Sequence, residues 1–423
     1  MRRFLVAIVA FIWSVSAIAD EFKHGTPESA GMSSERLERV TDVMQSYIDR
    51  GYVPGIHVLV ARRGVIVYDN AIGTRGKDDD RPLEKDALYR IYSMTKPITA
   101  VAAMQLYEQG KFKLDSPVAE FISEFGELKV HAGDEEPVPV NRPMNMRHLL
   151  THTAGLGYGL GNRHPVDRLF RQNRVLGSTD LDEMIGKMKE IPLKFQPGDR
   201  WDYSAAVDVT GLVVQRLSGQ SFNEYLEEHI FAPLRMDDTF FEIPEDKHDR
   251  LLPVHNWSRQ ESGAIVMRPN QPTDYRNVTM FSGGGGLIST GMDYLRFAEA
   301  LRRGGELEGS RIIGRKTIEY MTQNHLPATL PGAGTGDNPT AAATRAQQSS
   351  FGFGLGFGIN TNPMADGNLS SRGEFNWGGA AGTVFWVDPE EELVVVGLIQ
   401  LMGGGILRLG TNLKVAVLQA ITD

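Results

Sequence analysis

The sequence predicts a mixed α/β fold of the α+β kind, in which an antiparallel sheet is flanked by helices and carries an inserted, mainly helical domain. Two observations support it. Apolar, β-branched runs occur in pairs near both ends of the chain, and a long stretch with helical patterns, residues 93–241, lies between them. The economical arrangement is a sheet built from both termini, so the predicted domains are residues 20–90 with 275–423 and an insertion of residues 91–274.

The elements are predicted from capping residues, turn residues and hydrophobic spacing. Ser33 or Ser34 caps a helix that runs to about Arg50. A hairpin follows, because the turn residues Arg63-Gly64 separate two β-like runs at 56–62 and 65–72. The later elements are helices at 290–303 and 315–323, a surface loop at 327–350, a second hairpin of 382–387 and 393–401, and a closing amphipathic helix at 413–421.

Residues 1–19 have the pattern of a secretory signal peptide. Arg2 and Arg3 precede an apolar run at 4–12, and the small residues around Ala19 fit a cleavage site. The alternative, an anchoring helix, is disfavoured because the apolar run is short for a bilayer, so no stable membrane insertion is expected. We therefore expect an exported protein, periplasmic or secreted after cleavage near Ala19.

Composition excludes several classes of function. The chain has 423 residues, no cysteine and a formal net charge of −9. Without cysteine there are no disulfides, no thiolate metal sites and no cysteine nucleophile. The acidic balance argues against a nucleic-acid surface, which needs clustered Lys and Arg. Composition does not exclude an enzyme that acts on small or neutral organic substrates.

The first candidate for chemistry is Ser93 with Lys96. Pro97 is tolerated only near the first turn of a helix, so the helix begins close to Ser93 and places Ser93 and Lys96 on one face. A hydroxyl at a helix N-terminus beside an ammonium is in a field that favours its ionised form. Taken alone, the pair is better explained by Ser93 as an N-cap with a solvated Lys96, so its interpretation depends on the other motifs.

A tyrosine and a glycine-rich segment complete the pattern. Tyr203 follows the turn residues of 197–200 and precedes a predicted helix at 207–217. A free tyrosine loses its proton near pH 10, so action as a base at pH 7 requires about 4 kcal/mol of cationic stabilisation. Lys96, when desolvated, is the alternative base. The segment Trp377-Gly378-Gly379-Ala380 leads into a strand, and we expect an edge strand there whose backbone closely approaches a ligand.

These three elements, in this order, resemble the serine-reactive β-lactamase and penicillin-binding-protein superfamily, and within it the class C-related branch that includes the family VIII carboxylesterases. The matching signatures are Tyr92-Ser-Met-Thr-Lys96, Arg147-His-Leu-Leu-Thr-His-Thr-Ala-Gly-Leu156, Trp201-Asp-Tyr-Ser204, Pro233-Leu-Arg-Met-Asp-Asp-Thr-Phe240, Gly283-Gly-Gly-Gly-Leu-Ile-Ser-Thr290 and Trp377-Gly-Gly379. They run along most of the chain after residue 19.

The resemblance implies a β-lactamase/transpeptidase-like fold and a role for each matching residue. Ser93 would be the acylated nucleophile, and Lys96 and Tyr203 would form the base pair. The backbone N–H groups of Ser93 and Ala380 would form the oxyanion hole. Residues 377–379 (Trp377, Gly378 and Gly379) would line the substrate.

Two departures from the class C pattern bear on the substrate. Ala205 stands where class C lactamases have an asparagine, and Trp377-Gly378-Gly379 stands where they have Lys-Thr-Gly. In that pattern the lysine and threonine hold the carboxylate of β-lactams. Without this carboxylate clamp, charge-assisted hydrogen bonds worth about 1.5–3 kcal/mol are lost, so β-lactams should bind poorly. The indole of Trp377 offers apolar area and one N–H donor, which suits esters with apolar groups.

Other clusters carry weaker signals. His148 and His152 have the spacing of zinc ligands, but position 149 is leucine and no third ligand is apparent, so helix-end hydrogen bonding is favoured. Gly283–Gly286 lacks the Lys-Ser/Thr of a phosphate loop, and a flexible wall near the site is expected instead.

We therefore predict an exported serine hydrolase that cleaves carboxylic esters through an acyl-enzyme on Ser93, with no metal or organic cofactor. Its partner would be a small-molecule ester or amide, not nucleic acid. The alternatives are amide chemistry (a D,D-peptidase, a D-aminopeptidase or a weak β-lactamase), transfer of the acyl group to another alcohol, and a non-catalytic module that binds cell-wall fragments. Nothing in the sequence indicates the oligomeric state or the acyl-chain preference.

Overall fold

The computed structural model describes residues 22–161, 164–259, 265–270, 274–327, 330, 351–403 and 407–423. The predicted signal peptide, residues 1–19, lies outside the described residues, as does nearly all of the predicted surface loop at 327–350.

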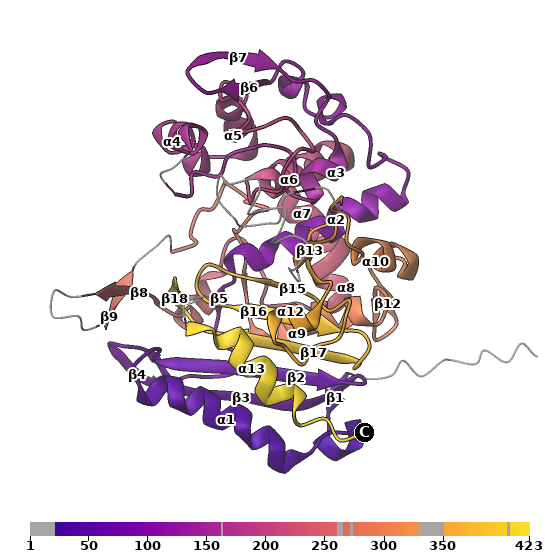
Figure 1. Ribbon diagram of the computed structural model, residues 1–423. Coiled ribbons are helices and arrows are strands. Elements are labelled where there is room, and N and C mark those ends of the chain that lie inside the picture. The colour runs from indigo at the N-terminus through magenta and orange to yellow at the C-terminus, as the bar shows by residue number, and fades with distance from the viewer. Residues whose placement is uncertain are drawn as a thin grey trace, which may run out of the picture.

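Strands from both ends of the chain form the main sheet (Figure 1). Within the described residues the strand order is β1 (Lys23–His24), β3 (Val65–Gly76), β2 (Gly55–Arg62), β17 (Leu393–Leu398), β16 (Val384–Asp388), β15 (Phe375–Gly378), β14 (Gly358–Asn360) and β13 (Phe351–Phe353), with β4 (Asp79–Pro82) paired to β3. β1 runs parallel to β3, and the other pairs along this order are antiparallel. The predicted fold class is confirmed.

Turn chemistry fixes the first hairpin. Arg63 and Gly64 have φ values of 53° and 77°, the left-handed pair that matches the twist of a two-residue hairpin. The second hairpin joins β16 and β17, and every residue of β17 is buried. The central strands are apolar on both faces because both faces are covered by helices.

The two faces of the sheet belong to two hydrophobic clusters. Val58 and Val60 of β2 pack with α1 (Ser34–Asp49) and α13 (Leu409–Leu418), whereas Leu59 and Ala61 point to the other cluster, which includes residues of α9 (Gly291–Arg302). This alternation is the two-residue period of a strand. The helix α13 begins four residues before the predicted start at 413, since apolar Leu409 already packs in the core.

The middle of the chain forms a mainly helical part that lies away from the terminal strands (Figure 1). Its flanking strands β5 (Tyr89–Arg90) and β10 (Ile288–Ser289) pair with each other, so the chain leaves and returns at one place. Its helices are α2 (Thr95–Glu108), α3 (Met146–Leu150), α4 (Pro165–Gln172), α5 (Leu181–Met188), α6 (Ala206–Ser218), α7 (Phe222–Leu226) and α8 (Ala232–Leu234). The domain limits at 91 and 274 stay a prediction.

Short elements complete the structure. They are the hairpin of β6 (Lys129–Ala132) and β7 (Glu135–Pro139), the sheet of β18 (Leu401–Met402), β8 (Val254–Arg259) and β9 (Ile265–Asn270), the pair β11 (Glu306–Leu307) and β12 (Ser310–Arg311), and the helices α10 (Arg315–Met321) and α12 (Pro363–Asp366). No helix in the described ranges is long and apolar enough to cross a membrane.

A buried arginine ties the segment before α1 and the C-terminal residue to the sheet. Arg62, which is 3% exposed, donates to the carbonyls of Ala30, Gly31 and Glu391 and pairs with Asp423 at 2.7 Å. We expect Arg62→Ala to lower the free energy of unfolding by about 3 kcal/mol, because it leaves buried carbonyls unpaired.

The neighbouring Arg63 supplies the control for a urea-unfolding measurement. Its side chain is 43% exposed and forms surface pairs with Glu392 and Asp423. Since asparagine tolerates the left-handed φ of this position, Arg63→Asn should cost less than about 1 kcal/mol. Equal losses of unfolding free energy for Arg62→Ala and Arg63→Asn would contradict the stabilising role of the buried Arg62 contacts.

Candidate active site

The N-terminus of α2 positions Ser93 and Lys96. A 3-10 turn at Tyr92–Met94 leads directly into α2, and residues 95–106 of that helix are all buried. Lys96 Nζ donates to Ser93 Oγ at 3.3 Å, and the lysine residue is only 1% exposed. The predicted pair on one helical face is therefore in contact.

Tyr203 reaches the same serine from a loop that ends at α6. Its hydroxyl donates to Ser93 Oγ at 2.6 Å, and Lys96 Nζ lies 4.5 Å from the centroid of its ring. The structure thus brings Ser93, Lys96 and Tyr203 together, as the sequence predicts. In its phenolate form a tyrosine can remove the proton of such a hydroxyl, and as a phenol it can return a proton, while a neighbouring ammonium stabilises the phenolate.

A second tyrosine, which sequence reasoning missed, also contacts the lysine. Lys96 Nζ donates to the Tyr158 hydroxyl at 3.2 Å, and the rings of Tyr158 and Tyr203 meet edge to face at 5.3 Å. Burial raises the pKa of Tyr158 to about 12, although Lys96 acts in the opposite direction. Tyr158 is therefore a neutral phenol at ordinary pH. Its only sequence signal is its place in the glycine-rich run that follows Leu156.

The third acceptor of Lys96 is a backbone carbonyl. Lys96 Nζ donates to the oxygen of Gly284, and the N–H of Gly284 donates to Asp208 Oδ1 at 2.9 Å. The hydroxyl of Ser282 donates to the same oxygen. The predicted glycine wall therefore lies at the site and links Lys96 to Asp208, a buried acid on α6 that the sequence reading did not single out.

The contacts of Lys96 Nζ fit an ammonium ion. A carbonyl can only accept, so Nζ must donate to Gly284, and the hydroxyls of Ser93 and Tyr158 lie where they can accept the other two protons of an ammonium. Burial alone would lower the pKa of Lys96, but the negative charge of Asp208, together with that of Tyr203 and Tyr158 when they are ionised, outweighs burial and raises the pKa above the ordinary lysine value. We therefore infer that Lys96 is a buried cation.

The strand that carries Trp377 lies beside this cluster. The Trp377 ring is 5.7 Å from the ring of Tyr203. A Cβ on Gly379, the residue directly after β15, would lie 2.4 Å from the Ile91 carbonyl oxygen, so only glycine lets the chain there approach the backbone that precedes Ser93. Gly378 pairs with Val384 inside the sheet.

β15 as a whole is not an edge strand, because β14 and β13 extend the sheet beyond it. The β14 ladder ends at Asn376, so Trp377 and Gly378 have no partner in β14. Ala380 lies in the turn after β15, is exposed, and accepts the N–H of Gly403 through its carbonyl at 3.3 Å. The oxyanion hole of the Ser93 and Ala380 N–H groups stays a prediction.

Aromatic side chains surround Tyr203. Phe353 lies 5.2 Å from Trp377 and 5.7 Å from Trp201, and Phe351 lies 5.2 Å from Trp201, measured between ring centroids. Such a wall is apolar and carries no fixed charge. It is compatible with apolar substrate groups.

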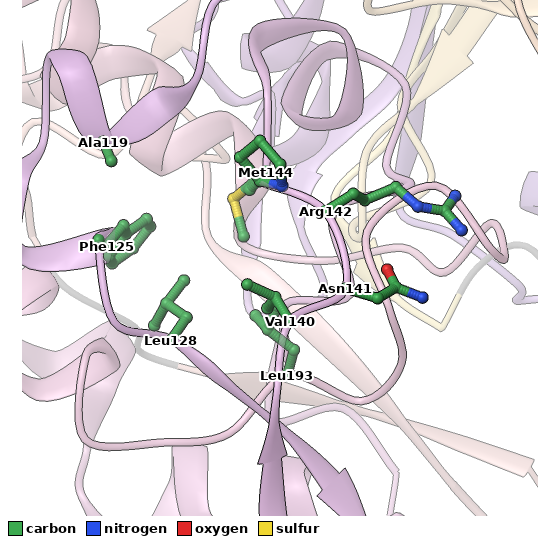
Figure 2. A pocket seen from close by; sticks show the side chains of 10 residues that line it. Ala119, Phe125, Leu128, Val140, Asn141, Arg142, Met144 and Leu193 are labelled. Atoms are coloured by element: carbon green, nitrogen blue, oxygen red, sulfur yellow. The ribbon is translucent and has the colours of Figure 1, made fainter.

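A pocket of about 230 Å³ in the helical part is separate from this cluster. Figure 2 shows the apolar side chains of Phe125, Leu128, Val140, Met144 and Leu193 around it, and neither Ser93, Lys96 nor Tyr203 lines it.

The histidines at 148 and 152 do not form a metal site. His148 Nδ1 accepts the N–H of Asn145 and belongs to a capping box of α3, the helix-end role that was expected. In the part of the chain that the structure describes, no group of three or more His, Asp or Glu residues could hold a metal ion.

The sheet of terminal strands, the helical insertion and the serine–lysine pair define a serine hydrolase with a β-lactamase/transpeptidase-like fold. The chain belongs to the β-lactamase family, whose model matches residues 40–417.

Its relatives include Esterase EstB of Burkholderia gladioli, 32% identical over 85% of this chain and 88% of that protein. Lovastatin esterase of Penicillium rubens is 28% identical over 84% of this chain and 91% of that protein. Among solved structures, EstCE1, a hydrolase with promiscuous acyltransferase activity, is 26% identical with a TM-score of 0.76, over 90% of this chain and 98% of that one.

The charge on Asp208 can be tested separately from its hydrogen bonds. Asp208→Asn removes the negative charge that raises the pKa of Lys96, so that pKa should fall and Lys96 should deprotonate at lower pH. We expect a serine-reactive phosphonate to label the variant about tenfold more slowly than wild type at pH 9.

Ser282→Ala is the matched control, since it removes one donor to Asp208 and keeps the charge. Its labelling rate should stay within about threefold of wild type at each pH. Identical pH profiles for wild type and Asp208→Asn would show that Asp208 does not influence Lys96.

Proposed function

We propose that this β-lactamase-family hydrolase cleaves carboxylic esters through an acyl-enzyme on Ser93. The observation that carries the proposal is the 2.6 Å contact between the Tyr203 and Ser93 hydroxyls beside a buried lysine cation. A non-catalytic binding module has no need for this arrangement.

In the proposed reaction Tyr203 first releases its hydroxyl proton to water, and the resulting phenolate takes the proton of Ser93 Oγ as this oxygen attacks the ester carbonyl carbon. The Lys96 ammonium stabilises the negative charge on the tyrosine oxygen. The tetrahedral intermediate then breaks its bond to the alcohol oxygen, which leaves with the proton from Tyr203. Water then attacks the acyl carbonyl carbon and gives one proton to the Tyr203 phenolate. The second tetrahedral intermediate breaks its bond to Ser93 Oγ, which takes this proton from Tyr203 as the carboxylic acid departs.

Three features favour esters over β-lactams. Trp377 occupies the place of the lysine that holds the β-lactam carboxylate in the class C pattern, and its ring packs against Tyr203. Ala205 is fully buried and offers no amide to a substrate. Two of the relatives reported above are named esterases.

We also propose that the protein is exported, with the signal-like residues 1–19 as its secretory signal peptide.

The substrate class is tested with short-chain p-nitrophenyl esters and a chromogenic cephalosporin. We expect ester turnover at a kcat/KM roughly ten- to a hundredfold above that for the cephalosporin, because the carboxylate clamp is missing. Ser93→Ala should abolish ester turnover and phosphonate labelling. Turnover that survives Ser93→Ala would overturn the mechanism, and equal turnover of both substrates would overturn the specificity.

The two tyrosines provide a matched pair. Tyr203→Phe removes the proposed base and should lower kcat by roughly 10²–10⁴-fold with little change in KM. Tyr158→Phe removes only one acceptor of Lys96, so we expect a loss of about tenfold. Steady-state kinetics on the same ester measure both. If Tyr158→Phe loses more kcat than Tyr203→Phe, the two assignments must be exchanged.

A further inference from the structure

Tyr203 lies on a loop, so its position next to Ser93 requires a fixed support. The chain between α5 and α6, residues 189–205, contains no helix or strand, and Tyr203 lies three residues before α6. A hydroxyl that must sit 2.6 Å from its partner cannot rely on such a loop alone.

His152 holds the backbone on both sides of Tyr203. Its carbonyl oxygen accepts the N–H of Asp202 at 2.9 Å, and its Nδ1 accepts the N–H of Ser204 at 3.3 Å. His152 itself follows α3 with a left-handed φ of 55°. Left-handed backbone is uncommon for histidine, so the surrounding contacts must maintain it.

The imidazole also packs on the Tyr203 ring. The two ring centroids are 4.8 Å apart, and Phe353 and Trp201 lie 5.4 and 6.0 Å from His152. The residue is only 1% exposed. Rotation of the Tyr203 side chain away from Ser93 would have to displace this ring.

The imidazole is neutral. Nδ1 can accept the Ser204 N–H only when it carries no proton. Burial, and then the charge of Lys96, lower the pKa of His152 well below its ordinary value. Ser93 Oγ receives hydrogen bonds from Lys96 and Tyr203. His152 contacts Tyr203, so it acts on Ser93 through the tyrosine.

Packing alone does not account for a histidine at this position. Its Nε2 is buried without a hydrogen-bond partner among the described residues. A buried N–H without a partner destabilises a fold, and phenylalanine would fill a similar space without this penalty. What phenylalanine could not do is accept the Ser204 N–H, as His152 Nδ1 does.

We propose that His152 is a positioning residue, whose carbonyl, Nδ1 and ring together hold the Tyr203 hydroxyl against Ser93. This inference rests on the proposed function, and it gives His152 a role that the proposed reaction itself does not include.

Two substitutions separate the acceptor from the ring. His152→Phe keeps an aromatic ring and loses Nδ1, whereas His152→Asn keeps an acceptor at the δ1 position and tolerates the left-handed φ. We expect His152→Phe to lower kcat roughly ten- to a hundredfold, with KM changed less than about threefold. His152→Asn should recover most of that loss, and phosphonate labelling should follow the same order.

His148→Gln is the matched control, because His148 is a half-buried histidine of the same segment that caps α3 and does not contact Tyr203 in the structure. It should leave kcat unchanged, and a melting temperature for each variant shows whether the protein is folded under assay conditions. If His152→Phe is at least as active as His152→Asn, or if its kcat equals that of wild type, the proposal is overturned.

The pH dependence of kcat/KM gives an independent readout. Because His152 stays neutral, wild type and His152→Asn should have the same pH profile. A titration step that disappears in His152→Asn would make His152 a proton-transfer group and overturn the positioning role. If wild type itself shows neither ester turnover nor Ser93 labelling, the proposed function fails, and the inference fails with it.

Discussion

The site depends on a single buried cation. Lys96 is almost completely removed from solvent, and an ammonium is stable there only if each of its protons meets an acceptor and a negative charge lies nearby. Ser93, Tyr158 and the Gly284 carbonyl supply the acceptors, and Asp208 supplies the charge. A lysine held as an ammonium cannot act as a base, so the proposed reaction assigns that role to Tyr203.

The fold brings these groups together from distant parts of the chain. α2 is buried along most of its length and fixes Ser93 and Lys96, α6 carries Asp208, and the glycine segment before β10 passes between them. The main sheet supplies the opposite wall, where Gly379 lets β15 approach Ile91. The helical insertion and the terminal sheet therefore each contribute one side of the site, which is the usual location of a ligand cleft.

Local chemistry made much of this predictable from the sequence. The Arg63-Gly64 turn and the position of Pro97 predicted a hairpin and a helix start that the structure contains. The order of strands in a sheet depends on contacts between distant parts of the chain. The glycines around Trp377 therefore could not show that β14 and β13 lie beyond β15. Tyr158 and Asp208 were missed for the same reason, because nothing in a glycine-rich run or an apolar helix shows that Lys96 lies beside it. Roles for Ala380 and residues 1–19 stay predictions.

The protonation state of Lys96 is the central claim, and it can be measured directly. Lysine-selective ¹⁵N labelling, with the Lys96 signal assigned by its loss in Lys96→Met, reports whether Nζ is an ammonium or a neutral amine. The contacts of Nζ predict an ammonium signal from pH 6 to beyond pH 9. A Lys96 signal that moves to the neutral amine below pH 8 would contradict this and make the lysine itself the base.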